Sequence, residues 1–134
     1  MNKRITSNNI IKLEENQIFV FASNLSGIHG KGAALTARKW GAIFYQSSGL
    51  QGKTWAIPTK DASIKRTLTI NEIKPYVDDF IEFAKSNSQF TFLVTEIGCG
   101  LAGLTPEQVA PLFKEVVDIE NIFLPKRFWK SLNK

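Results

Sequence analysis

Cysteine and histidine are nearly missing from this sequence, which has one of each among 134 residues. The single cysteine, Cys99, excludes an internal disulfide and suits a reducing compartment. One cysteine and one histidine do not make the ligand set of a zinc site, so we expect no metal and no other cofactor. No apolar run approaches the roughly 20 residues of a membrane-spanning helix, and no charged-then-apolar leader opens the chain. We therefore expect a soluble, cytoplasmic protein without a membrane partner.

The residues that are present have the composition of a globular protein with a basic surface. Hydrophobic residues make up 43% and charged residues 22% of the chain, which argues against disorder. There is no repeat, low-complexity tract or linker, so we expect one domain over residues 1–134. The net charge of +5 favours anionic partners, either a nucleic acid or a small phosphate ligand. The basic residues are scattered except for a C-terminal cluster of Lys126, Arg127, Lys130 and Lys134.

Short apolar runs alternate with segments of helical periodicity. Runs rich in β-branched and aromatic residues predict buried strands over 17–22, 54–57, 90–95 and 121–124, the second ending at Pro58. Helices are predicted over 33–40, over 71–86 and from residue 105 onward. Strands that alternate with helices favour an α/β fold with a mainly parallel sheet covered by helices.

Two of the predicted helices carry specific signals. In the segment 71–86, the apolar residues fall on one face at helical spacing: Ile73, Val77, Phe80, Ile81 and Ala84. Residues 105–108 (TPEQ) have the form of a capping box with proline at the first helical position. We expect Pro111 to cost the helix that follows a hydrogen bond and to kink it.

Two glycine-rich segments each follow a predicted strand and precede a predicted helix. We call residues 23–32 (SNLSGIHGKG) the first glycine loop and residues 97–103 (IGCGLAG) the second glycine loop. Glycines permit close backbone approach, and free N–H groups at such turns and at helix N-termini bind anions. In parallel sheets, ligands bind beyond the carboxyl ends of the strands, where both loops lie. The alternative is that each loop is only a flexible or tight connection.

Four segments resemble those of the macro domain family, which binds ADP-ribose: 5–10 (ITSNNI), 18–24 (IFVFASN), 30–33 (GKGA) and the second glycine loop. The resemblance implies a three-layer α/β/α fold with a mainly parallel mixed sheet flanked by helices. The IGCGL stretch is similar to that of the subgroup containing the terminal ADP-ribose protein glycohydrolase. The SNL-x-G-x-HG-x-GAA stretch also resembles small phage-associated macro-like proteins.

The resemblance implies a role for each matching residue. Asn24 is expected to hydrogen-bond the distal ribose near the reacting carbon. Asn9 stands where the family usually has an aspartate that binds adenine, so the charge-assisted bond is missing. The remaining residues are expected to line the ribose and the diphosphate: Ser23, Gly30, Gly32, Ala33, Gly98, Cys99, Gly100, Leu101, Ala102 and Gly103.

Lys60 is the candidate nucleophile that the resemblance implies. It resembles the lysine that attacks the anomeric carbon of ADP-ribose in the glycohydrolase subgroup. That subgroup also needs a carboxylate in the second loop, where this chain has Ala102. Glu96 or Asp61 could supply a carboxylate from another direction. The alternative for Lys60 is a surface lysine that contacts phosphate or solvent.

His29 lies in the first glycine loop, where a histidine can act as a general acid or base near neutral pH. Alternatively, it is a hydrogen-bonding loop residue. Ser23 and Cys99 have no evident base partner in the sequence, which argues against a nucleophilic triad.

Three functions remain open at this point. The first is hydrolysis, either of ADP-ribose from a modified acceptor such as an ADP-ribosylated macromolecule, or of phosphate from ADP-ribose 1″-phosphate. The second is a non-catalytic module that binds ADP-ribose or a related nucleotide, which Ala102 favours. The third is a nucleic-acid-binding protein that uses its basic surface.

Overall fold

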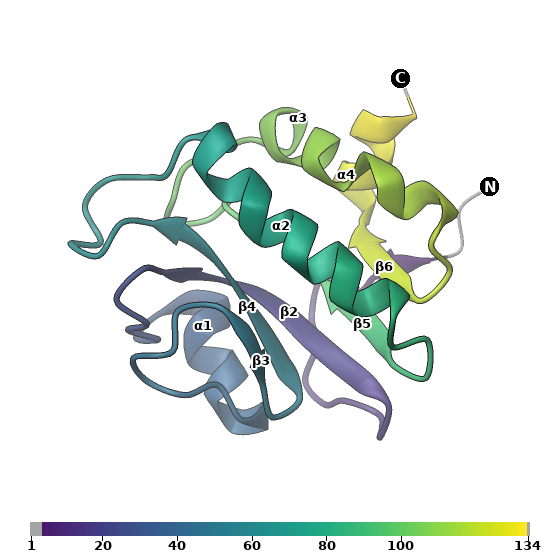
Figure 1. Cartoon of the computed structure of the whole chain (residues 1–134), viewed down its shortest axis with the longest axis horizontal. Coiled ribbons are helices and arrows are strands. Elements are labelled where there is room, and N and C mark those ends of the chain that lie inside the picture. Colours follow the sequence, from purple (N-terminus) through teal and green to yellow (C-terminus); the bar gives the residue numbers. More distant parts are fainter. Residues whose placement is uncertain (1–3, 134) are drawn as a thin grey trace.

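A six-stranded sheet lies at the centre of the computed structural model, which describes residues 4–133 (Figure 1). The strands lie in the order β1-β6-β5-β2-β4-β3. All neighbouring strands are parallel except β3 and β4, which are antiparallel. The sheet is therefore mixed and mainly parallel, as the sequence predicts. The strands are β1 (Ile5–Thr6), β2 (Gln17–Asn24), β3 (Gly49–Gln51), β4 (Thr54–Lys60), β5 (Thr91–Val94) and β6 (Ile122–Pro125).

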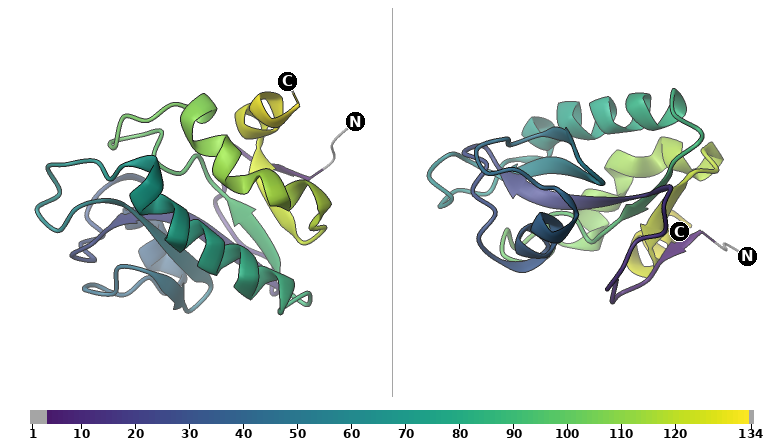
Figure 2. Two further views of the ribbon diagram at one scale, coloured as in Figure 1. Left: turned by 45° about the horizontal axis from the view of Figure 1, so that its top comes forward. Right: turned by 90° about the horizontal axis from the view of Figure 1, so that it is seen from below.

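Helices cover both faces of the sheet and complete three layers (Figure 2). The short helix α1 packs on one face, and α2, α3 and α4 pack on the other together with the 3₁₀ helix η2. This confirms the expected α/β/α layering. The helices are α1 (Gly32–Ala37), η1 (Arg38–Trp40), α2 (Ile70–Lys85), α3 (Pro106–Val109), η2 (Ala110–Asp118) and α4 (Lys126–Leu132).

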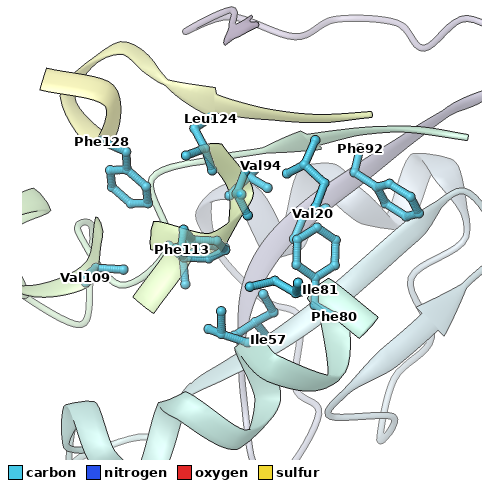
Figure 3. Close-up of a cluster of buried hydrophobic side chains, with 14 of the residues drawn as sticks. Val20, Ile57, Phe80, Ile81, Phe92, Val94, Val109, Phe113, Leu124 and Phe128 are labelled. Carbon is cyan, nitrogen blue, oxygen red and sulfur yellow. The ribbon is translucent and has the colours of Figure 1, made fainter. Parts of the chain in front are cut away.

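The central strand β2 shows how the sequence divides the core in two. Successive side chains of a strand point to opposite faces of the sheet. Ile18 and Val20 accordingly join the larger apolar cluster under α2, η2 and α4, whereas Phe19 and Phe21 pack with α1. Figure 3 shows the larger cluster, in which the Phe80 ring lies edge-on to Phe92 with 5.4 Å between centroids. Every residue of the predicted apolar face of α2 is buried in this cluster.

Two local features differ in detail from what the sequence predicts. Strand β4 does not end at Pro58 but continues to Lys60. Because β3 pairs only with residues 54–56 of β4, Pro58 lies where β4 is the edge of the sheet, and edge strands tolerate proline. The helix after Thr105 is capped as predicted, but it changes at Ala110 into the 3₁₀ helix η2, with non-helical dihedral angles at Phe113 rather than a simple kink at Pro111.

Candidate functional site

The carboxyl ends of the parallel strands meet at one edge of the sheet, and two adjoining cavities lie there. The larger cavity, of about 810 Å³, lies between the two glycine loops. The smaller cavity, of about 520 Å³, lies beyond the ends of β1 and β6. Both cavities are lined by Ala33, Thr95 and Glu96, so they adjoin, and we call the two together the cleft.

Most of the residues predicted for the site line this cleft. His29 and Gly103 line neither cavity, and Asn9 lines the smaller one. The others line the larger cavity: Ser23, Asn24, Gly30, Gly32, Ala33, Lys60, Gly98, Cys99, Gly100, Leu101 and Ala102.

Asn24 ends strand β2 and shapes the first glycine loop. Its side chain is only 8% exposed. The amide nitrogen donates to the carbonyl of Ile28 at 2.8 Å, and the amide oxygen accepts from the Ser26 hydroxyl and the Ile28 N–H at 2.8 and 3.0 Å. An asparagine amide has two donor hydrogens, so one N–H is left for a ligand in the cleft. Asn24 therefore orders the loop and still faces the cavity with one donor.

The first glycine loop packs closely against residues 43–47. Gly27 has a φ of +70°, and a Cβ at this position would lie 2.5 Å from the carbonyl carbon of Tyr45. The Tyr45 N–H donates to the Gly27 carbonyl at 2.8 Å, and the Ser23 hydroxyl donates to the Ser47 carbonyl. Only glycine permits this approach, which fixes the loop at the edge of the cleft.

The second glycine loop presents free backbone donors to the larger cavity. Within the loop, the N–H groups of Cys99 and Gly103 donate to the carbonyls of Glu96 and Gly100, both at 3.0 Å. Among residues 4–133, the N–H groups of Gly100, Leu101 and Ala102 have no protein acceptor. The first turn of α1 lines the same cavity, and the first N–H groups of a helix have no intrahelical acceptor. Two sets of free donors thus face one space, an arrangement that suits a diphosphate.

Lys60 and Asn24 lie side by side, as register partners at the ends of β4 and β2. The Lys60 side chain is partly buried and lines the larger cavity, so it is not simply a surface lysine. Its Nζ donates to the Ile64 carbonyl at 3.4 Å. The neighbouring Asp61 lines neither cavity, because its carboxylate accepts from the Ser63 hydroxyl at 2.7 Å within its own turn.

Glu96 lies where the two cavities meet and is held by Arg127 of α4. The guanidinium donates twice to the carboxylate, from Nε at 2.7 Å and from one terminal nitrogen at 2.6 Å. The hydrogen bond from Arg127 holds the pKa of Glu96 below its ordinary value, so this carboxylate is ionised at neutral pH. The sequence offers no signal for this pair, whose members are 31 positions apart.

Cys99 lines the larger cavity, and its surroundings disfavour the reactive thiolate. Burial raises the pKa of its thiol to about 11, and the nearby charge of Glu96 adds to the effect. The thiolate is the reactive form, and it is scarce when the pKa is this high. The thiol instead donates to the Ile97 carbonyl at 3.5 Å, which agrees with a packing role.

His29 is fully buried beneath the first glycine loop, not exposed to the cleft. Its ring lies edge-on to Phe21, with 5.2 Å between centroids, and stacks near Phe44. Its Nε2 lies 2.9 Å from the Ile43 carbonyl. With no contact to the cavity, His29 has no place in the chemistry proposed below.

The smaller cavity has an apolar wall and an unsatisfied hydroxyl. Phe19 and Ile10 provide apolar surface, and the exposed Asn9 lies at the rim. Thr6 is 3% exposed, and among residues 4–133 its hydroxyl has no hydrogen-bond partner. Buried polar groups are usually hydrogen-bonded, so an unpaired hydroxyl on a residue that lines a cavity is unusual. Sequence reasoning missed Thr6, because a lone threonine in a two-residue strand carries no pattern.

Between residues 4 and 133, no three His, Cys, Asp or Glu side chains come together as metal ligands would. In the same range, none of the helices combines the length and apolar character needed to cross a membrane.

Several solved structures are similar to this chain over most of its length. The macrodomain of Mycobacterium tuberculosis DarG matches with a TM-score of 0.65 and 19% identity, over 90% of this chain and 95% of that one. A Streptomyces coelicolor macrodomain protein matches with a TM-score of 0.55 and 16% identity, over 87% and 90%. This chain has a macrodomain fold. The sheet order and the three layers described above are therefore those of a macrodomain fold.

A third structure places the macrodomain fold within a longer protein. Thermosipho africanus DarTG, solved in complex with ADP-ribose, matches with a TM-score of 0.58 and 21% identity over 87% of this chain. This chain spans 43% of the length of that one. No protein-family model and no curated protein matches the sequence.

Proposed function

We propose that this macrodomain binds ADP-ribose or a close derivative in the two-part cleft and hydrolyses a bond at the distal ribose. The observation that carries the proposal is the larger cavity, which the two glycine loops line together with Asn24 and Lys60. Free backbone N–H groups from both sides suit the diphosphate, and Asn24 and Lys60 lie side by side at the strand ends.

The smaller cavity suits the other end of such a ligand. Ligand sites are mostly apolar with a few polar groups that fix orientation. The apolar surface of Phe19 and Ile10 fits a base or nucleoside, and the free hydroxyl of Thr6 and the carboxylate of Glu96 are hydrogen-bonding groups beside it. A ligand with a nucleoside at one end and a ribose phosphate at the other would fill both cavities.

Lys60 would act as the nucleophile in the hydrolysis. Its uncharged amine forms a bond to C1″ of the distal ribose while the bond from C1″ to the acceptor breaks. The acceptor leaves with that electron pair and takes up the proton that the lysine nitrogen gives up. Water then adds at C1″, which releases ADP-ribose and restores the amine. The acceptor is either a group on an ADP-ribosylated macromolecule or the phosphate of ADP-ribose 1″-phosphate.

A binding module without catalysis is the second candidate, favoured by Ala102. In the described part of the chain, no carboxylate contacts Lys60: Asp61 bonds within its own turn, and Glu96 pairs with Arg127. A lysine without a carboxylate partner can still contact phosphate.

Calorimetric titration with ADP-ribose, followed by turnover assays on ADP-ribosylated protein and ADP-ribose 1″-phosphate, tests the proposal. We expect a submillimolar Kd and measurable turnover. Lys60→Ala should lower kcat by about 100-fold, because it removes the nucleophile, and Asn24→Ala should weaken both binding and turnover. Lys114→Ala is the matched control, because Lys114 is exposed on η2 and lines neither cavity.

Each result separates the candidates. Binding without turnover would leave the non-catalytic module. No heat at submillimolar ADP-ribose would reject the ligand. Turnover that survives both substitutions would show that other residues carry the reaction.

A further inference from the structure

The turn that follows Lys60 has a strained residue at its tip. Ile64 has a φ of +65°, in the left-handed region that β-branched residues rarely adopt. The residue is partly buried and lines the larger cavity beside Lys60. A residue held in this conformation persists only where its surroundings fix it, and such residues cluster at ligand sites.

Hydrogen bonds within the turn hold Ile64 in place. The Ile64 N–H donates to the Asp61 carbonyl at 3.0 Å, and the Asp61 N–H donates to the Arg66 carbonyl at 2.9 Å. The Asp61 carboxylate accepts from the Ser63 hydroxyl at 2.7 Å and from the Arg66 N–H at 3.3 Å. Asp61 therefore stabilises the turn through these hydrogen bonds, although it does not line the cavity.

Two further contacts fix the turn to the body of the protein. The Arg66 guanidinium donates to both oxygens of Glu72, at 2.8 and 3.1 Å, and Glu72 is the capping-box residue of α2. The Thr67 hydroxyl donates to the carbonyl of Ala102 at 2.6 Å. The turn is thus tied to the first turn of α2 on one side and to the second glycine loop on the other.

We propose that the turn of residues 61–67 positions Lys60, with the Ile64 carbonyl as the acceptor that orients its amine. In the described part of the chain, this carbonyl is the group that accepts from Lys60 Nζ. A carboxylate partner would favour the charged ammonium, whereas a carbonyl orients the nitrogen without adding an opposite charge. The turn places the Ile64 carbonyl 3.4 Å from Lys60 Nζ, and Thr67 links the turn to the loop that would hold the diphosphate.

The inference rests on the proposed function for its catalytic consequence, but its structural part is testable without turnover. NMR relaxation of the lysine side-chain carbons measures how rigidly each Cε is held. In the unmodified protein, Lys60 Cε should be more ordered than the Cε of Lys114, which is exposed on η2 and has no ion pair among the described residues. Thr67→Val, which removes only the bond to Ala102, and Asp61→Ala should each lower the order of Lys60 to the level of Lys114.

The control is Asp78→Ala, because Asp78 is a carboxylate on the exposed side of α2 that pairs with Lys74. It should leave the order of Lys60 unchanged. If the proposed hydrolysis occurs, Thr67→Val and Asp61→Ala should lower kcat at least tenfold while KM changes less than twofold. If the turn had only a structural role, the two substitutions would lower the free energy of unfolding without lowering kcat more than they change KM.

Three results would overturn the inference. The first is a Lys60 side chain as mobile as that of Lys114 in the unmodified protein. The second is an order of Lys60 that neither variant changes. The third is a loss of order that Asp78→Ala reproduces. If turnover is never found, the relaxation data still decide whether the turn positions Lys60, so failure of the proposed function remains a separate outcome.

Discussion

The first glycine loop can pack against residues 43–47 only because Gly27 has no Cβ. Gly27→Ala should lower the free energy of unfolding by about 3 kcal/mol, because it adds a left-handed alanine and a clash with the Tyr45 backbone. Gly49→Ala is the matched control, since Gly49 also has a positive φ, +88°, but nothing within 4 Å of its Cβ position. It should lose only about 1–2 kcal/mol. Equal losses in urea denaturation would show that the contact with Tyr45 does not matter.

The ion pair between Glu96 and Arg127 should make stability depend on pH. The pKa of Glu96 is lowered in the folded protein from an ordinary value of 4.5, so the pair stabilises the protein above that pH and is lost as pH falls through the lowered pKa. Because 60% of the Arg127 side chain is exposed, Glu96→Gln should lower the unfolding free energy at pH 7 by only about 0.5–1 kcal/mol. The difference should shrink below pH 4.5.

Denaturation from pH 3 to 7 measures this difference. Glu120→Gln is the control, because Glu120 is exposed and has no ion pair among the described residues. A gap between Glu96→Gln and the unmodified protein that stays constant down to pH 3 would contradict the assigned cause.

At the scale of single residues, the sequence predicts where the cleft lies but not all of the residues that line it. Asn24 is the last residue of β2, and the second glycine loop begins soon after β5 ends at Val94. The distance of a residue from a strand end is a local property of the chain. Thr6, by contrast, reaches the cleft only because β1 pairs with β6, whose partner residues are 119 positions away in the register Ile5↔Leu124 and Thr6↔Pro125. The burial of His29 likewise depends on Phe44 and Ile43, which no spacing rule places above it.

At the element scale, the capping box of α3 should control the second glycine loop. The Thr105 hydroxyl accepts from the Gln108 N–H at 3.2 Å, and the Gln108 side chain accepts from the Thr105 N–H at 2.9 Å. The loop closes immediately before this cap, where the Leu104 N–H donates to the Gly98 carbonyl at 2.8 Å. Thr105→Ala should cost about 1 kcal/mol and speed amide exchange at Leu104.

Thr105→Ser is the control, since serine keeps the capping hydroxyl and should keep most of the stability. Hydrogen exchange followed by NMR compares the two variants. Equal exchange at Leu104 in both would mean that the cap does not hold the loop.

The sequence predicts the helices and strands that depend on neighbouring residues, but not those that depend on partners far away in the chain. The apolar face of α2 and the capping box of α3 are properties of neighbouring residues, and both were predicted. Strands β1 and β3 have two and three residues, too few to show alternation, and exist because partners lie beside them. Helix α4 follows β6 directly and is rich in basic residues, but its Phe128 and Trp129 are buried under the sheet and stabilise it there.

At the scale of the whole molecule, the net charge of +5 is compatible with two kinds of anionic partner, and salt separates them. The proposed ligand carries a diphosphate that would lie among backbone donors, whereas a nucleic acid would contact exposed side chains such as Lys126 and Lys130. The affinity of a protein for duplex DNA falls with salt with a log–log slope of about −0.9 for each phosphate neutralised. We expect ADP-ribose binding, measured by calorimetry from 50 to 300 mM NaCl, to have a slope no steeper than about −2, because the diphosphate contributes about two charges.

A double-stranded oligonucleotide titrated over the same range is the comparison. If ADP-ribose is the ligand, the oligonucleotide should bind weakly at about 150 mM salt and lose its affinity steeply, as non-specific contacts do. Lys114→Ala with Lys130→Ala should reduce only the oligonucleotide slope, because both lysines are exposed and neither lines the cleft. Submicromolar oligonucleotide binding that persists at high salt, together with no ADP-ribose binding, would assign the basic surface rather than the cleft as the functional site. The cleft favours ADP-ribose binding because the donors proposed for the diphosphate are main-chain groups, fixed by the two glycine loops whatever the charge of the surface around them.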